Sequence, residues 1–252
     1  MNSPESLQRQ YFQAVERVLA CIRSTQAEAI DRAAALITEA VTGGHACHLY
    51  DTGHMLTHEL VGRAGGLLLF SPIRTTLEVH HAARPRPEAA GRVRLNWDEL
   101  DGLARLILSQ SACAAGDVLI IGSVSGVSRL AVGLALEARR MGLHTIAITS
   151  TVYARALEST HPSGKRLFEV ADIVLDHATP VGDAVVRVPD LGAAICPVSG
   201  IAAAYLMWTL TAHVVERMLA AGRLPSVLVS NHLPGAPERN AAARRRFVEL
   251  GY

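Results

Sequence analysis

A serine-rich turn lies between an apolar run and a helical pattern, and it reads Ser123-Val124-Ser125-Gly126-Val127-Ser128. Gly126 permits a tight backbone turn, and the amide N–H groups at a helix start favour a bound anion. The serine hydroxyls could add donors without adding charge. The turn lacks the lysine of a P-loop, which argues against nucleotide hydrolysis. We therefore predict that Ser123, Ser125, Gly126 and Ser128 bind a phosphate group; the alternative is an ordinary serine helix cap.

Polar residues at the end of a later strand and in the following loop could contact the same anion. Ser150 and Thr151 end the predicted strand, on the side where ligands bind, unless they are ordinary helix caps. Lys165 lies in a loop that contains proline and glycine. It could neutralise a phosphate or reach a partner subunit, and the alternative is a surface lysine. We predict that all three residues contact the substrate.

Histidines near the start of an earlier helical pattern are candidates for a metal site. His54 and His58 are four residues apart and share a helix face, and with Asp51 they could hold a divalent ion such as zinc. This spacing also arises by chance in a chain with eleven histidines. We therefore expect no cofactor, with zinc as the alternative. His80 and His81 lie in a predicted loop over 74–96, where substrate contact is the alternative to a plain surface position.

The segments that must position these residues alternate between strand and helix patterns. Several strands are continuously apolar, which requires cover on both faces and is typical of a parallel sheet. The pattern predicts a doubly wound, Rossmann-like α/β fold with a five-stranded parallel sheet, in which ligands bind beyond the carboxyl ends of the strands. The predicted helices are two within 4–42, then 55–64, 98–112, 128–141 and 197–222. The predicted strands lie within 46–54, 66–73, 115–123, 144–150 and 168–178.

Composition and charge exclude several classes of protein. Half of the residues are hydrophobic but only 4% are aromatic, which suits a core of Ala, Val, Leu and Ile. The formal net charge of +1 gives no electrostatic case for binding nucleic acid. The uncharged stretch 198–212 is shorter than the roughly 20 residues of a membrane span, and the polar N-terminus lacks the apolar core of a signal peptide. Four scattered cysteines without a CxxC pair fit a reduced, cytoplasmic protein.

The serine-rich turn also matches a family pattern. Its sequence SVSGVS fits the S-x-S-G-x-[ST] turn of the sugar isomerase (SIS) domain, which binds phosphosugars. Further similarity lies in YDTGH…ELVGRAGG, GDVLIIGSVSG, ALEARRMGLHTIAITS, HPSGKRLFEVADIVLD, VGDA and VVERMLAAG. Over roughly residues 5–240 the chain resembles single-domain SIS proteins of bacteria, which are similar to phosphoheptose isomerase and to N-acetylmuramic acid 6-phosphate etherase. With the helical pattern, this resemblance predicts N-terminal helices over 1–44, an SIS domain over 45–240 and a polar tail over 241–252.

The resemblance implies a phosphorylated sugar as ligand and, as the preferred reaction, aldose–ketose isomerisation through an enediol. It implies that Glu59 is the general base, with an ion pair to Arg63 as the alternative, and that His232 is a candidate acid or base. The implied substrate contacts of the first turn are Thr52, Gly53 and His54. An etherase-type lyase and a non-catalytic phosphosugar sensor are the alternative functions. Because SIS proteins commonly build their site from two subunits, we expect a homodimer or homotetramer.

Three positions depart from the family pattern. The first turn of such proteins usually resembles G-T-G-H-S, whereas this chain has Asp51 in place of the first glycine and Met55 in place of the serine. Val124 replaces an asparagine inside the second turn. A carboxylate beside a phosphate is repulsive unless it meets a sugar hydroxyl or a metal. Asp51 therefore predicts either a shifted ligand or a changed substrate.

Overall fold

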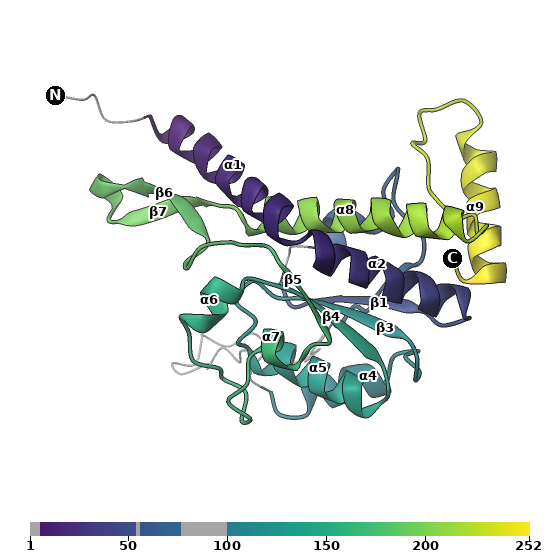
Figure 1. Cartoon of the computed structure of the whole chain (residues 1–252), viewed down its shortest axis with the longest axis horizontal. Coiled ribbons are helices and arrows are strands. Elements are labelled where there is room, and N and C mark those ends of the chain that lie inside the picture. The colour runs from purple at the N-terminus through teal and green to yellow at the C-terminus, as the bar shows by residue number, and fades with distance from the viewer. Residues whose placement is uncertain (1–5, 54–55, 77–99) are drawn as a thin grey trace, which may run out of the picture.

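The computed structural model describes residues 6–53, 56–76 and 100–252, and its centre is a parallel sheet (Figure 1). The strands are β1 (Cys47–Asp51), β2 (Phe70–Pro72), β3 (Val118–Gly122), β4 (His144–Thr149) and β5 (Ile173–Asp176). They form one five-stranded sheet in the order β2-β1-β3-β4-β5, which confirms the predicted doubly wound α/β fold. His54, His80, His81 and most of the predicted loop over 74–96 lie outside the described residues.

The register of the sheet brings the carboxyl ends of four strands to one edge. Asp51 at the end of β1 pairs with Gly122 at the end of β3, and Gly122 lies opposite Ile148 of β4. Thr149 of β4 pairs with Asp176 of β5. The turns that follow β1, β3, β4 and β5 therefore begin next to one another.

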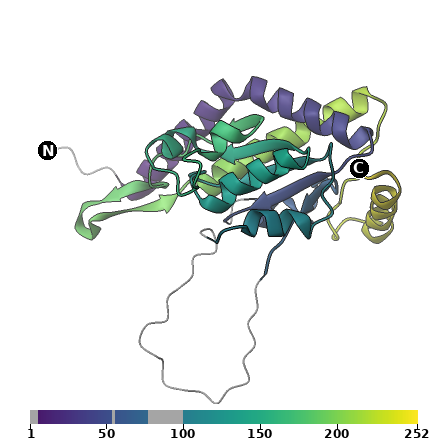
Figure 2. The same cartoon turned by 90° about the horizontal axis from the view of Figure 1, so that it is seen from below.

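Helices cover both faces of the sheet, as the continuously apolar strands predict (Figures 1 and 2). Side chains of β3 alternate between two cores, with Ile120 in one and Leu119 and Ile121 in the other, and all three are fully buried. The first core is shared with α1 (Leu7–Thr25), α2 (Ala27–Thr42) and α8 (Ser199–Ala220). The second is shared with α4 (Leu103–Ser109), α5 (Arg129–Arg140) and α7 (Leu167–Val170).

The segment after β1 is less helical than predicted. Helix α3 covers only Thr57–Leu60 instead of 55–64, because Val61 is extended and Gly62 has a φ of 75°. The chain over 65–68 instead hydrogen-bonds with the chain over 226–228, for example from the amide N–H of Gly65 to the carbonyl of Leu228 at 2.7 Å. This long-range pairing replaces the end of the predicted helix and the start of the predicted strand over 66–73.

A β-hairpin between β5 and α8 was not predicted. It consists of β6 (Ala184–Val188), a 3-10 turn over Pro189–Leu191 and β7 (Ala193–Pro197). The hairpin extends from the body of the molecule beside α1 (Figure 1). Asp183 ties its base to α8, because this carboxylate accepts the amide N–H groups of Val198 and Ser199 at 3.0 and 2.8 Å.

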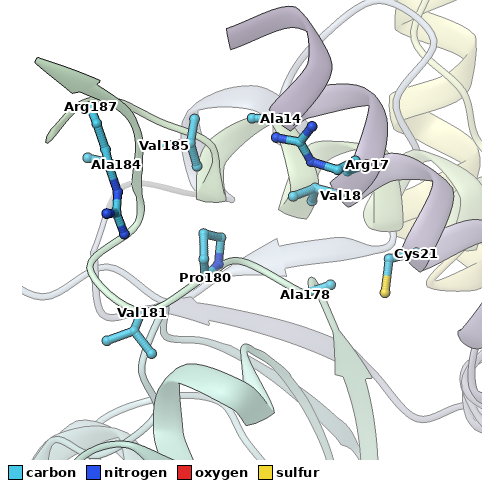
Figure 3. A pocket seen from close by; sticks show the side chains of 10 residues that line it. All are labelled: Ala14, Arg17, Val18, Cys21, Ala178, Pro180, Val181, Ala184, Val185 and Arg187. Atoms are coloured by element: carbon cyan, nitrogen blue, oxygen red, sulfur yellow. The ribbon is translucent and has the colours of Figure 1, made fainter. Parts of the chain in front are cut away.

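The hairpin and α1 do not pack completely against each other. A cavity of about 400 Å³ lies between α1 and the segment over 178–187. Its walls are largely apolar, and Arg17 from α1 faces the cavity across from Arg187 of β6 (Figure 3). The cavity shows that β6 covers only part of the exposed side of α1.

Two further helices complete the described structure. Helix α6 (Thr151–Arg155) follows β4 directly, and α9 (Ala236–Leu250) lies at the C-terminal end (Figure 1). Most of the polar segment over 241–252 is therefore helical, including the arginines over 244–246. Across 6–53, 56–76 and 100–252, no helix is both long enough and apolar enough to cross a membrane.

Candidate functional site

The serine-rich turn connects β3 to α5 at the carboxyl edge of the sheet, and its three hydroxyls differ in their surroundings. The Ser128 hydroxyl caps α5 by accepting the amide N–H of Ala131 at 3.2 Å. The Ser123 hydroxyl is buried and accepts the amide N–H of Gly126 at 3.3 Å. The half-buried Ser125 hydroxyl has no hydrogen-bond partner among the described residues. Two of the hydroxyls therefore shape the turn as acceptors and keep their O–H donors, and the Ser125 hydroxyl has both functions available. Phosphate binding by Ser123, Ser125, Gly126 and Ser128 stays a prediction.

The backbone of the turn also presents unused donors. Within the described chain, the amide N–H groups of Ser125, Val127 and Ser128 make no hydrogen bond. They precede α5, a helix of 12 residues whose N-terminus carries a partial positive charge. Amide donors at such a helix start are suited to bind an anion.

Gly126 is required by packing as well as by backbone conformation. Its φ is 61°, in the left-handed region that favours glycine. A Cβ atom at this position would lie 2.6 Å from Thr149 Oγ1 and 3.1 Å from Leu167 Cβ. The carbonyl of Gly126 also accepts the amide N–H of Leu167 at 2.8 Å. The turn is thus held against β4 and α7.

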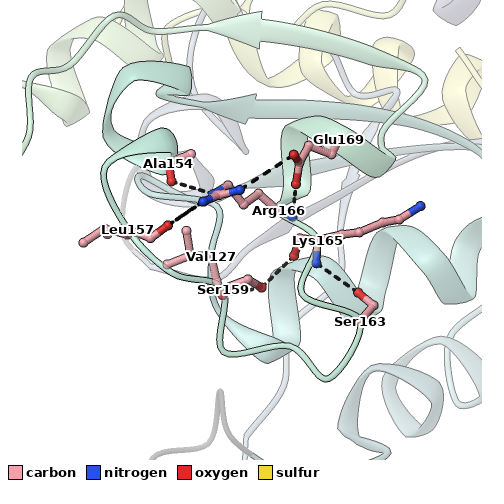
Figure 4. Close-up of polar contacts among 8 residues, drawn as sticks. All are labelled: Val127, Ala154, Leu157, Ser159, Ser163, Lys165, Arg166 and Glu169. Atoms are coloured by element: carbon pink, nitrogen blue, oxygen red, sulfur yellow. Dashed lines mark hydrogen bonds and ion pairs between the residues drawn. The ribbon is translucent and has the colours of Figure 1, made fainter.

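The loop over 156–166 supports the turn from the side of α7. The carbonyl of Val127 accepts the amide N–H of Thr160 at 3.0 Å and lies 3.4 Å from the Ser159 hydroxyl. The Arg166 guanidinium holds the loop closed by donating to the carbonyls of Ala154 and Leu157 at 2.8 and 2.9 Å (Figure 4). These contacts fix the backbone that faces the turn.

Lys165 lies on this loop but takes no part in closing it through its side chain. Its carbonyl accepts the Ser159 hydroxyl at 2.6 Å, and its amide N–H lies 3.3 Å from the Ser163 hydroxyl. The exposed amine extends away from these groups (Figure 4) and has no ion-pair partner among the described residues. A phosphate contact by Lys165 stays a prediction.

The hydroxyls that end β4 are engaged within the protein. Ser150 is fully buried, donates to the carbonyl of Thr179 at 2.6 Å and accepts the amide N–H of Tyr153 at 3.1 Å as the cap of α6. The Thr151 hydroxyl donates to the carboxylate of Asp176. Both side chains therefore serve the alternative role of caps and ties in this structure, and their contact with substrate stays a prediction.

The first turn places the unexpected aspartate in a structural role. Asp51 accepts the amide N–H of Gly53 at 3.1 Å through one oxygen and that of Leu56 at 2.6 Å through the other. The Thr52 hydroxyl donates to the carbonyl of Gly122 at 3.0 Å, and the Thr52 amide donates to the same carbonyl at 2.9 Å. The carboxylate thus organises its own turn, which gives Asp51 a role that needs neither a metal nor a sugar hydroxyl.

Comparison with known proteins places the site in a family. The sequence model of the SIS domain matches residues 10–150, which include the first turn, the serine-rich turn and α5. A UPF0309 protein from Shouchella clausii is 31% identical over 239 residues, covering 94% of this chain and 95% of the relative. A UPF0309 protein from Streptomyces griseus is 33% identical over 247 residues, covering 97% and 96%. The chain belongs to the UPF0309 family of SIS-domain proteins.

A solved structure shares the SIS fold. A Silicibacter pomeroyi protein, assigned as a phosphosugar isomerase, superposes with a TM-score of 0.50 at 18% sequence identity. The superposition covers 95% of this chain and 56% of the other. At this level of identity the likeness concerns the arrangement of helices and strands.

The two catalytic candidates of this UPF0309 protein lie on neighbouring segments. Glu59 on α3 is half-buried and forms the i,i+4 ion pair with Arg63 that the sequence offered as the alternative role. His232 is exposed and lines a cleft of about 270 Å³ together with Arg244 and residues on either side of Arg63. Within the described chain no hydrogen bond or ion pair joins the side chains of Glu59 and His232. Their catalytic roles stay predictions.

The described residues do not supply a set of ligands for the alternative of a bound metal ion. In 6–53, 56–76 and 100–252, no group of three or more His, Cys, Asp or Glu side chains is arranged to hold a metal ion. His54 and the side chain of His58 lie outside the described part. The zinc alternative therefore stays a prediction.

A buried histidine behind the site was missed at the sequence level. His177 follows β5, is fully buried, and pairs through Nδ1 with the Thr179 hydroxyl at 2.7 Å. Its Nε2 has no hydrogen-bond partner in the described structure. Burial lowers the pKa of His177 to about 4, so the ring is neutral near pH 7. Its position near the end of the predicted strand over 168–178 was the available signal, because ligand-side residues of parallel sheets lie at the carboxyl ends of strands.

Proposed function

We propose that this UPF0309 protein binds a phosphorylated sugar and interconverts its aldose and ketose forms through an enediol. The observation that carries the proposal is the free Ser125 hydroxyl beside three unpaired amide N–H groups at the start of α5. An anion with several acceptor oxygens satisfies such a group of donors. The phosphosugar isomerase name of the Silicibacter pomeroyi structure agrees with this ligand class.

The serine-rich turn divides its work between shape and binding. The Ser123 and Ser128 hydroxyls accept amide N–H groups of the turn and helix, which keeps the backbone donors in place. Ser125 adds a donor to the phosphate without adding charge. A hydrogen bond to a charged group contributes about 1.5–3 kcal/mol, which corresponds to a loss of affinity of about tenfold or more on its removal.

The isomerisation needs a base next to the bound sugar. The base removes a proton from the carbon beside the carbonyl, and the resulting enediol is protonated again on the neighbouring carbon. In our proposal Glu59 is this base, because α3 follows the first turn at the carboxyl edge of the sheet. The ion pair with Arg63 then has to open or turn toward the substrate during the reaction.

A phosphosugar sensor is the second candidate, and the same ion pair favours it. A glutamate held by Arg63 on a partly exposed helix has the partner expected of a surface residue. A sensor would bind the sugar phosphate through the same turn and leave it unchanged. Binding and turnover therefore have to be measured separately.

The first experiment compares binding of a panel of sugar phosphates by wild type, Ser125→Ala and Ser109→Ala. Ser109 is a matched control, because its hydroxyl donates only to the carbonyl of Leu106 in its own helix. Ser125→Ala should weaken binding about tenfold or more without lowering the melting temperature, and Ser109→Ala should bind as wild type does. Equal affinities of all three proteins would remove the proposed phosphate site.

The second experiment follows the bound sugar phosphate in heavy water. An isomerase incorporates deuterium at the carbon beside the carbonyl, and Glu59→Gln should abolish this exchange while binding persists. A lyase changes the mass of the sugar by loss of a leaving group. Binding with neither exchange nor mass change would replace the isomerase proposal with the sensor.

A further inference from the structure

A second cluster of reactive side chains lies at the amino edge of the sheet, away from the serine-rich turn. It consists of His48 on β1, Asp117 directly before β3, and Cys113 four residues earlier. His48 and Asp117 are 6% and 4% exposed, and Cys113 is half-buried. Nothing in the proposed isomerisation uses these residues.

The Asp117 carboxylate fixes the histidine ring. One oxygen accepts the amide N–H of Ala46 at 2.8 Å. The other accepts the amide N–H of Ala114 at 2.8 Å and lies 2.9 Å from His48 Nε2. A carboxylate on one ring nitrogen sets the orientation of an imidazole and stabilises its protonated form, while the other nitrogen remains for a second partner.

Cys113 is connected to the His48–Asp117 pair through its neighbour in the chain. Ala114, the next residue in the chain, meets His48 at the same carboxylate oxygen. The Ser111 hydroxyl donates to the carbonyl of Leu108 at 2.8 Å, and its oxygen lies 3.2 Å from Cys113 Sγ. Burial lowers the pKa of His48, but interactions with Cys113 and Asp117 outweigh it and leave the pKa above its ordinary value.

A cavity adjoins the cluster and is lined by His48 and by Ser111 and Ala112, the two residues before Cys113. His48 and Ser111 line a space of about 780 Å³ beside α4, and this volume lies in the range of small-molecule pockets. Two further ionisable groups of the described residues lie near this cluster. His45 Nδ1 lies 3.8 Å from Asp117, and Arg74 stands on the wall of the cavity.

We propose that Cys113 is a nucleophilic thiol, served by His48 and Asp117, that exchanges with low-molecular-weight disulfides. His48 accepts the thiol proton as Sγ attacks one sulfur of the disulfide. A new S–S bond forms to Cys113, the original S–S bond breaks, and the released thiolate takes the proton from His48. Cys113 ends as a mixed disulfide beside the cavity, and a second thiol restores it by the reverse exchange.

The other cysteines provide internal standards for this reaction. Cys21 on α1 is exposed and represents an ordinary accessible thiol. Cys47 is 1% exposed, and burial raises its pKa, so it should react only when the protein unfolds. Cys196 is intermediate in exposure, like Cys113, but lies on the hairpin. A comparison of Cys113 with Cys196 therefore separates activation from access.

The test is the rate at which oxidised glutathione modifies each cysteine at pH 7, read by peptide mass spectrometry. Cys113 should react at least tenfold faster than Cys21 and Cys196. His48→Gln should bring Cys113 to within about threefold of Cys21, whereas His45→Gln, at the more exposed neighbour of the same carboxylate, should leave its rate unchanged. Unaltered rates at Cys21 and Cys47 show that a variant is folded.

A second measurement keeps the proposal falsifiable if His48→Gln fails to fold. An ordinary thiol loses about tenfold in rate for each pH unit below its pKa of about 8.5. In wild type the ratio of the Cys113 rate to the Cys21 rate should therefore rise by severalfold between pH 8 and pH 6.5. A constant ratio, a Cys113 no faster than Cys21, or a folded His48→Gln variant with wild-type rates would overturn the proposal.

Discussion

Replacing Gly126 by alanine tests whether the serine-rich turn is held by contact with β4. Alanine at a φ of 61° costs about 1–2 kcal/mol, because its Cβ crowds the following carbonyl. The same Cβ would lie 2.6 Å from Oγ1 of the fully buried Thr149, and such overpacking costs about 1–3 kcal/mol more. Gly126→Ala should therefore lower the free energy of unfolding by about 2–5 kcal/mol.

The matched control is Gly164→Ala, in the loop that supports the turn. Gly164 has a φ of 68° and nothing within 4 Å of an added Cβ, so this variant should lose only the backbone cost of about 1–2 kcal/mol. Urea unfolding measures both variants. The double variant Gly126→Ala with Thr149→Ala should recover part of the loss and give a coupling energy of about 1 kcal/mol or more. Equal losses at the two glycines, with no coupling, would refute a turn packed on Thr149.

Three further predictions concern the first turn and the buried histidines. Asp51→Ala should lower the free energy of unfolding, measured in urea, by about 1–3 kcal/mol, because two amides of the turn lose their acceptors. Asp51→Asn keeps one acceptor oxygen and should therefore lose less stability. Equal losses for the two variants would contradict this role of Asp51. The raised pKa of His48 gives a stabilisation that is present below about pH 6.5 and is lost as the pH rises through the pKa of His48 in the folded protein. The difference in unfolding free energy between wild type and His48→Gln should therefore shrink as the pH rises through this range. A constant difference would argue against a raised pKa. The pKa of His177 is lowered to about 4, so its effect on stability has the opposite pH dependence: the stabilisation is present above about pH 6.5 and is lost as the pH falls toward 4. His177→Asn should therefore reduce the loss of stability between pH 6.5 and pH 4. An unchanged slope would count against a buried neutral ring.

Local sequence patterns predicted the parts of the fold that rest on local rules. The apolar run over Val118–Gly122 has to be covered on both faces, and its side chains do alternate between two buried cores. The serine helix cap, which the sequence offered as the alternative to phosphate binding, is present, because Ser128 caps α5. The position of the serine-rich turn followed from the carboxyl-edge rule of parallel sheets.

The features that could not be predicted from the sequence depend mostly on contacts with residues distant in the chain. Ser125 and Ser150 both lie at strand ends, yet of the two only the Ser150 hydroxyl has a hydrogen-bond partner in the described structure. Its partner is the carbonyl of Thr179, 29 residues later in the chain. The helix of Glu59 ends at Leu60, and the chain over 65–68 pairs instead with residues 226–228, which are distant in the sequence. Strand β7 (Ala193–Pro197) is exposed over nearly its whole length, so it has no alternation of apolar and polar residues to reveal it.

The hairpin is built as a removable insertion. Ala184 and Pro197 face each other at its open end, and Asp183 fastens that end to the first amides of α8. The chain thus leaves and rejoins the body at almost one point, without passing through the five-stranded sheet. Residues 184–197 can be shortened, exchanged or excised with a short bridge while the connectivity of the sheet stays intact. Excision would expose the side of α1 that β6 covers, so α1 is the part of the body whose packing depends on the hairpin.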